Sequence, residues 1–209
     1  MKKLYQEIRI ENFEEIRKEI SLLLPDDIST FKDGMKSWVV DTNQTLTRCP
    51  FLNKFYVENI KKPISQIKFY VSPPGHGINP HIDGDNFKKQ PFSLILPIAN
   101  TKNTFLNWYE EDPDNFETRD LMTNPWPKNF KSVLTQVIVP KDIDKLRILD
   151  SLELVEPTFA RTNIMHDVTN RTNQTRITVV LRWGLHYTEI EEVFKTTDSS
   201  MNDIDNVFG

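Results

Sequence analysis

The chain is poor in cysteine and glycine, and it has no long hydrophobic run. Its 209 residues include one cysteine, Cys49, and six glycines. A single cysteine excludes an intrachain disulfide, so a reducing compartment such as the cytoplasm is expected. Aliphatic stretches are short; Leu22 to Leu24, for instance, ends at Pro25, which excludes a membrane-spanning helix there. The first ten residues carry charges throughout and lack the apolar core of a secretion signal.

Positive charge is also scarce. Lysine and arginine number 26 against 30 acidic residues, which gives a net charge of -4. This balance argues against a protein that holds duplex nucleic acid chiefly through its phosphates. A small molecule or a polypeptide is the expected partner, and a nucleotide or short single strand in a local pocket is not excluded. The hydrophobic share of 38% is that of an ordinary globular protein.

The apolar pattern changes near Pro63. Before it, apolar residues at helical spacing predict helices over 13–24 and 50–60, so residues 1–63 are expected to form a helical support. After it, short β-type runs predict an antiparallel sandwich or open barrel, making the chain mainly β with flanking N-terminal helices (α+β). The expected strands are 64–72, 78–83, 92–98, 104–109, 133–139, 146–155, 159–166 and 176–183.

One domain is expected over residues 1–197, with a β core over 64–187 and a flexible acidic tail over 198–209. Residues 108–145 are interpreted as an insertion in that core. Their proline, aspartate and aromatic residues are typical of a lid or substrate-binding loop, although a solvated acidic loop would have the same composition.

His81 and Asp83, in the run PHIDGD, are two positions apart. In a strand such residues point to the same face, so both could reach one metal ion. The spacing alone is weakly specific. Asp83 could equally cap a turn while His81 is exposed or hydrogen-bonded.

A second polar group follows later in the chain. His166 ends the expected strand 159–166, and residues 167–175 are interpreted as a polar turn. In the next strand Arg176 and Thr178 alternate with Ile177, Val179 and Leu181. We expect the apolar face to pack on the helices and the polar face to point into the barrel. A buried arginine is costly unless it meets an anion, and a guanidinium pairs well with a carboxylate. The alternative is an edge strand with a solvated face.

The stretches YVSPPGHGINPHIDGD and MHDVTNRTNQTRITVVLRW carry a family resemblance. The segment from Phe69 to Trp183 resembles the iron(II)- and 2-oxoglutarate-dependent dioxygenases, and is most similar to their aspartyl/asparaginyl β-hydroxylase-like and prolyl hydroxylase-like branches. The first stretch is similar to their approach to the first metal histidine. The second is similar to their distal histidine with an arginine ten residues later. The resemblance implies a double-stranded β-helix (jelly-roll, cupin-like) whose open end holds the iron.

The resemblance also implies roles for individual residues. Iron(II) would be bound by His81, Asp83 and His166, and 2-oxoglutarate by Arg176, with Thr178, Tyr70 and Asn163 as further contacts. Tyr70 could instead be a core residue, and Asn163 a surface residue. Trp108 and Trp126 could stack on a substrate or simply pack. The strand over 92–98 offers no secure equivalent of the basic residue that β-hydroxylases use for the cosubstrate; Lys88, Lys89 and Ser93 are the candidates.

The expected activity follows from the same resemblance. It is hydroxylation of a C–H bond with dioxygen, coupled to conversion of 2-oxoglutarate to succinate and carbon dioxide. Two alternatives stay open at this point. One is a cupin-like isomerase or hydrolase that uses the same three ligands with zinc or manganese. The other is a non-catalytic jelly-roll binding module.

Overall fold

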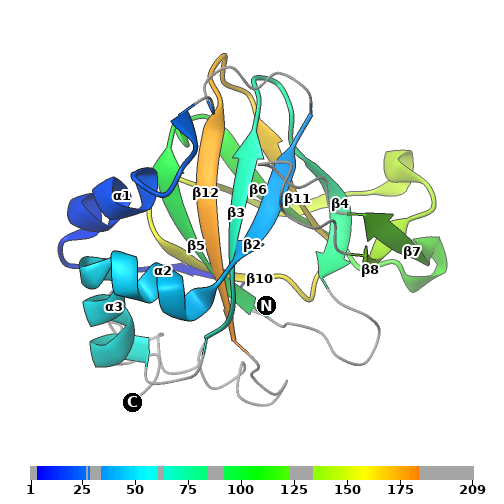
Figure 1. Ribbon diagram of the computed structural model, residues 1–209. Helices are drawn as coiled ribbons and strands as arrows, with labels where there is room; N and C mark the ends of the chain where they lie inside the picture. The colour runs from blue at the N-terminus through cyan, green and yellow to red at the C-terminus, as the bar shows by residue number, and fades with distance from the viewer. Residues whose placement is uncertain are drawn as a thin grey trace.

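Two six-stranded antiparallel sheets face each other in the computed structural model, which describes residues 4–26, 28, 34–60, 64–83, 92–122 and 134–183 (Figure 1). The first sheet has the order β1 (Tyr5–Glu7), β10 (Thr158–Arg161), β5 (Phe92–Ala99), β12 (Arg176–Trp183), β3 (Ile64–Ser72) and β2 (Lys36–Val40). The second has the order β7 (Phe116–Met122), β8 (Leu134–Pro140), β4 (Ile78–Asp83), β11 (His166–Asn170), β6 (Thr104–Tyr109) and β9 (Ile148–Glu153).

The chain passes back and forth between the two sheets. β3, β5, β10 and β12 lie in the first sheet, whereas β4, β6, β9 and β11 lie in the second. This eight-strand arrangement is a jelly-roll, so the expected fold class is confirmed. Short 3-10 turns precede β7 (Pro113–Asn115) and β9 (Ile143–Lys145).

Helices cover the outer face of the first sheet (Figure 1). They are α1 (Phe13–Ser21), α2 (Thr42–Arg48), α3 (Pro50–Phe55) and the π-helical turn Tyr56–Ile60 that continues α3. Buried residues of α1 and α3 share one core cluster with Ile177, Val179 and Leu181 of β12. The other face of β12 carries Val180, which belongs to the cluster between the sheets. The polar face of this strand therefore points into the barrel, as the alternation predicted.

The predictions of one strand over 159–166 and of a turn over 167–175 are wrong. β10 ends at Arg161, and His166 begins β11 in the other sheet. Asp167–Asn170, expected to be a turn, are part of β11. The apolar pattern hides the crossing because Ile164 and Met165 lie in it and are themselves buried.

Part of the interpreted insertion at 108–145 is sheet rather than loop. β7 and β8 form a hairpin, and β8 pairs with β4 through Ile138 opposite Ile82 and Val137 opposite Asp83. The hairpin thus extends the second sheet beyond β4, and β7 was not predicted. Residues 123–133, the end of the β core beyond 183 and the tail at 198–209 lie outside the described residues, so a lid there stays a prediction. Among the helices that the structure describes, none is long and apolar enough to cross a membrane.

Gly77, just before β4, allows the close approach of β4 and β11. A Cβ atom at this position would lie 2.0 Å from the backbone oxygen of Val168 in β11. A real carbon cannot occupy that space, so the two strands would have to separate.

We therefore expect Gly77→Ala to lower the free energy of unfolding by about 1–3 kcal/mol, because a core or backbone contact is overpacked. Chemical denaturation measures the loss. Gly75→Asn is the matched control, since Gly75 has a φ of 71° that asparagine tolerates and no neighbouring atom within 4 Å. Equal losses in the two variants would contradict the close-approach explanation.

Candidate metal centre

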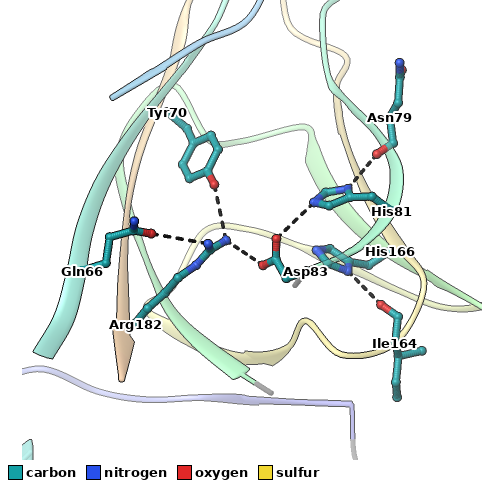
Figure 2. Close-up of polar contacts among 8 residues, drawn as sticks. All are labelled: Gln66, Tyr70, Asn79, His81, Asp83, Ile164, His166 and Arg182. Atoms are coloured by element: carbon teal, nitrogen blue, oxygen red, sulfur yellow. Dashed lines mark hydrogen bonds and ion pairs between the residues drawn. The ribbon is translucent and has the colours of Figure 1, made fainter. Parts of the chain in front are cut away.

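Three candidate metal ligands meet between β4 and β11. His81 and Asp83 project from β4, and the backbone of His81 pairs with that of His166 at the start of β11. One ligand atom from each side chain can be chosen so that all three atoms lie within 4.8 Å of one another. Figure 2 shows the two imidazoles and the carboxylate turned toward a common point. The structure thus brings together the three residues that the sequence singled out, although they come from strands 85 residues apart.

Both imidazoles are held in one orientation by backbone carbonyl groups. Nδ1 of His81 lies 2.8 Å from the carbonyl oxygen of Asn79, and Nδ1 of His166 lies 2.8 Å from that of Ile164. A proton on Nδ1 is donated to each carbonyl, which leaves the Nε2 lone pair of each ring available to a metal. The ring centroids are 4.5 Å apart.

Arg182 holds the third ligand from across the barrel. Its Nη2 donates to Oδ2 of Asp83 at 2.6 Å, and both side chains are largely buried. Oδ1 of Asp83 lies 3.5 Å from Nε2 of His81. Burial alone would raise the pKa of Asp83, but Arg182 and then His81 hold that pKa well below its usual range. Asp83 is therefore ionised at neutral pH, with Oδ1 directed toward the histidines.

His166 is prepared for metal binding by its burial. Desolvation lowers the pKa of His166 to about 4, and the neighbouring His81 acts in the same direction. The imidazole is neutral at pH 7, which is the form that binds a metal.

Arg176 is buried at the other end of β12. It is 2% exposed, and its Nε and Nη1 have no hydrogen-bond partner. Desolvation lowers the pKa of Arg176 to about 9, so at pH 7 it is still a cation. A buried and partly unpaired guanidinium is unfavourable for the empty protein, as expected of a group that binds an anion.

A cavity of about 410 Å³ opens beside two of the three candidate ligands, His81 and Asp83. Its wall includes Tyr70, His81, Asp83, Lys68 and Arg182. Arg176, Thr178 and Asn163 are not part of the wall. Thr178 is buried and pairs with Tyr70 in the sheet, and Asn163 is buried with its Oδ1 unpartnered.

Among the other predicted residues that the structure describes, Trp108 and Ser93 are not part of the cavity wall. Trp108 is fully buried, stacks on Tyr5 with ring centroids 5.3 Å apart, and donates from Nε1 to the carbonyl of Arg161. These are the contacts of a packing residue, so nothing in them supports a substrate role. Ser93 is buried opposite Arg182 in the first sheet. Trp126, Lys88 and Lys89 lie outside the described residues.

Two residues of the site were missed by the sequence reasoning. Arg182 lies six positions after Arg176 on the same face of β12, and that spacing was the available signal. Lys68 lies two positions before Tyr70 on β3 and faces the same cavity. Neither was assigned a role, because the sequence does not reveal which strand ends face each other.

Sequence comparisons find no matching family model and no matching curated protein. Several solved structures are similar. The non-haem α-ketoglutarate-dependent epimerase SnoN from nogalamycin biosynthesis has 12% identity and a TM-score of 0.47, covering 95% of this chain and 88% of that chain. A prolyl-4-hydroxylase from Pseudomonas putida has 9% identity and a TM-score of 0.42, covering 86% and 91%. A cupin domain from Bordetella pertussis Tohama I has 13% identity and a TM-score of 0.32, covering 73% and 96%. Identities this low and superpositions this partial assign no activity to the chain.

The pKa of His166 predicts a pH dependence of stability. The unfolded state binds more protons than the folded state between pH 6.5 and about 4, so the free energy of unfolding falls as the pH is lowered through this window. The expected loss is on the order of 2–3 kcal/mol. Denaturation of chelator-treated protein measures it. His166→Gln should flatten the profile, whereas His76→Gln, which alters an exposed histidine, should not. An unchanged profile in His166→Gln would refute this assignment.

Removing Arg182 leaves the Asp83 carboxylate buried without its cation. We expect Arg182→Met to cost about 3–5 kcal/mol of unfolding free energy, and the double variant with Asp83→Asn to cost less than the sum of the single changes. Arg119→Met is the control, because Arg119 is an exposed partner of Glu117 and such pairs contribute about 0–1 kcal/mol. Additive losses in the double variant would show that the two groups are not coupled.

Proposed function

We propose that this protein is a non-haem iron(II)- and 2-oxoglutarate-dependent oxygenase that hydroxylates a C–H bond of a small molecule or polypeptide. The observation that carries the proposal is the combination of two imidazoles and one carboxylate around a common point with a buried, incompletely paired arginine deeper in the same barrel. Two histidines and one carboxylate suit a non-haem iron(II) site that keeps positions open. The arginine suits the far carboxylate of a dicarboxylic keto acid.

The residues fit the metal in their chemistry. Nε2 of His81, Nε2 of His166 and Oδ1 of Asp83 would hold it, because the other polar atom of each side chain is already engaged. The two histidines are neutral donors, and the aspartate supplies one negative charge. Iron(II) with 2-oxoglutarate and dioxygen would supply oxidative decarboxylation to succinate and carbon dioxide, together with the oxidising power for the hydroxylation.

The chain itself would bind and orient the cosubstrate. Arg176 would hold the distal carboxylate by charge-assisted hydrogen bonds, with the hydroxyl of Thr178 beside it on β12. Tyr70 lines the cavity, and the next inward-facing residue of β3, Ser72, pairs with Arg176 in the sheet. Tyr70 therefore lies on β3 between the cavity and Arg176. Arg182 would keep Asp83 ionised and turned toward the metal. Trp108 and Val180 close the interior with apolar surface, which excludes water from this part of the barrel.

The proposal predicts that 2-oxoglutarate binds in the presence of iron(II) without oxygen, and that succinate forms when oxygen is admitted. Arg176→Met should weaken 2-oxoglutarate binding about tenfold or more. The same change should not lower the free energy of unfolding of the protein without ligands, because it removes a buried charge whose Nε and Nη1 lack partners. Calorimetry and denaturation measure the two quantities.

Arg171→Met is the matched control, since Arg171 is exposed and its guanidinium lies over the ring of Phe105. It should leave 2-oxoglutarate binding unchanged. A metal-dependent activity that needs no 2-oxoglutarate and survives Arg176→Met would favour a cupin-like isomerase or hydrolase. A protein that binds no divalent metal would favour a non-catalytic jelly-roll module.

A further inference from the structure

The cavity beside the metal ligands has one apolar wall. It is formed by β8 and the turn after it, through Val137, Val139, Pro140 and Ile143. Ile143 is a large apolar residue that is 60% exposed, so its side chain is accessible to a ligand in the cavity. Val137 pairs with Asp83, so the apolar wall begins one strand spacing, about 4.8 Å, from the metal-binding strand.

The opposite wall carries positive charge, in a protein whose net charge is -4. Its cations are Lys68 and Arg182, from β3 and β12. Arg182 is matched by Asp83. At the rim, Arg119 of β7 is matched by Glu117, to which its Nε donates at 2.6 Å. Asp83 is the sole acidic residue among the described residues of the cavity wall.

Of the cations in the cavity wall, Lys68 has no ion-pair partner among the described carboxylates. Its Nζ lies 4.8 Å from the centroid of the Tyr70 ring, a cation–π contact that leaves its N–H groups free to bind an anion. The side chain is half-buried, so its charge is less screened than that of a surface lysine. Arg176 is fully buried, whereas Lys68 is accessible from the cavity. The two cations can therefore bind different anions.

We infer that the substrate is a small organic anion with an apolar body, whose charged group binds Lys68 and whose body lies on Val137, Val139 and Ile143. That this anion is then hydroxylated rests on the proposed function, whereas its binding follows from the residues of the cavity alone. A body lying on Val137 is next to Asp83, which brings its C–H bonds to the metal. A carboxylate and a phosphate would both satisfy the lysine. The volume of the cavity is that of an ordinary small-molecule site.

The test uses four probes that share one alkyl chain: octanoate, octyl phosphate, octylammonium and octan-1-ol. Binding to the full chain is measured by calorimetry, without oxygen, in the presence of manganese(II) and 2-oxoglutarate so that the metal and Arg176 are engaged. At least one of the two anions should bind about tenfold or more tightly than the alcohol and the ammonium, as expected for a charge-assisted hydrogen bond. The tighter anion identifies the charged group.

Two variants with matched controls locate the site. Lys68→Met should remove the preference for the anion, whereas Lys102→Met, an exposed lysine away from this cavity, should keep it. Ile143→Ser should weaken binding of the preferred anion several-fold without affecting stability, because Ile143 is already mostly exposed. Ile148→Ser changes an equally exposed isoleucine outside the cavity and should have no effect on binding.

The same measurements are repeated on metal-free protein without 2-oxoglutarate. Anion binding that depends on Lys68 in this sample supports the inference even if 2-oxoglutarate never binds and the proposed function fails. Equal binding of all four probes would overturn the inference. So would a loss of 2-oxoglutarate binding in Lys68→Met as large as that in Arg176→Met, since Lys68 would then serve the cosubstrate.

Discussion

The ion pair between Asp83 and Arg182 is the interaction on which the candidate site depends. Asp83 belongs to the second sheet and Arg182 to the first, so their contact at 2.6 Å links the two sheets at the metal end of the barrel. A carboxylate buried so completely would otherwise take up a proton, and a protonated carboxyl is a poor metal ligand. The pair also assigns the two oxygens of Asp83, because Oδ2 is engaged by Arg182 and Oδ1 faces the histidines.

The two sheets contribute different chemistry to the barrel. The second sheet supplies the metal ligands. A carbonyl of β4 orients His81, and a carbonyl of the segment that leads into β11 orients His166. The first sheet supplies the cations Lys68, Arg176 and Arg182 along its inward face. Burying Arg176, Arg182 and the Asp83 carboxylate is unfavourable without further anions, so this arrangement suits a site that receives anionic ligands. The apolar outer face of the first sheet, packed under the helices, offsets this cost through the hydrophobic effect.

Much of this arrangement was predictable from local patterns. The limits of β3, β4 and β12 follow from their short β-type runs. The inward face of β12 follows from the alternation of Arg176 and Thr178 with Ile177 and Val179. The crossing between β10 and β11 was not predictable, because buried Ile164 and Met165 continue the apolar pattern through it. The roles of Arg182 and Lys68 depend on which strand ends meet across the barrel, and a periodic pattern carries no such information. Whether Trp108 stacks on a substrate or packs could not be decided from the sequence, because a fully buried tryptophan and a cavity-lining one have the same local sequence signal.

An anaerobic crystal structure with iron(II) and 2-oxoglutarate is the most direct test of the central claim. We expect metal bonds to Nε2 of His81, Nε2 of His166 and Oδ1 of Asp83, with Arg182 still bound to Oδ2. We also expect the distal carboxylate of 2-oxoglutarate on Arg176. A metal held by other residues would contradict this assignment, and so would a cosubstrate carboxylate on Lys68 with Arg176 left unpaired.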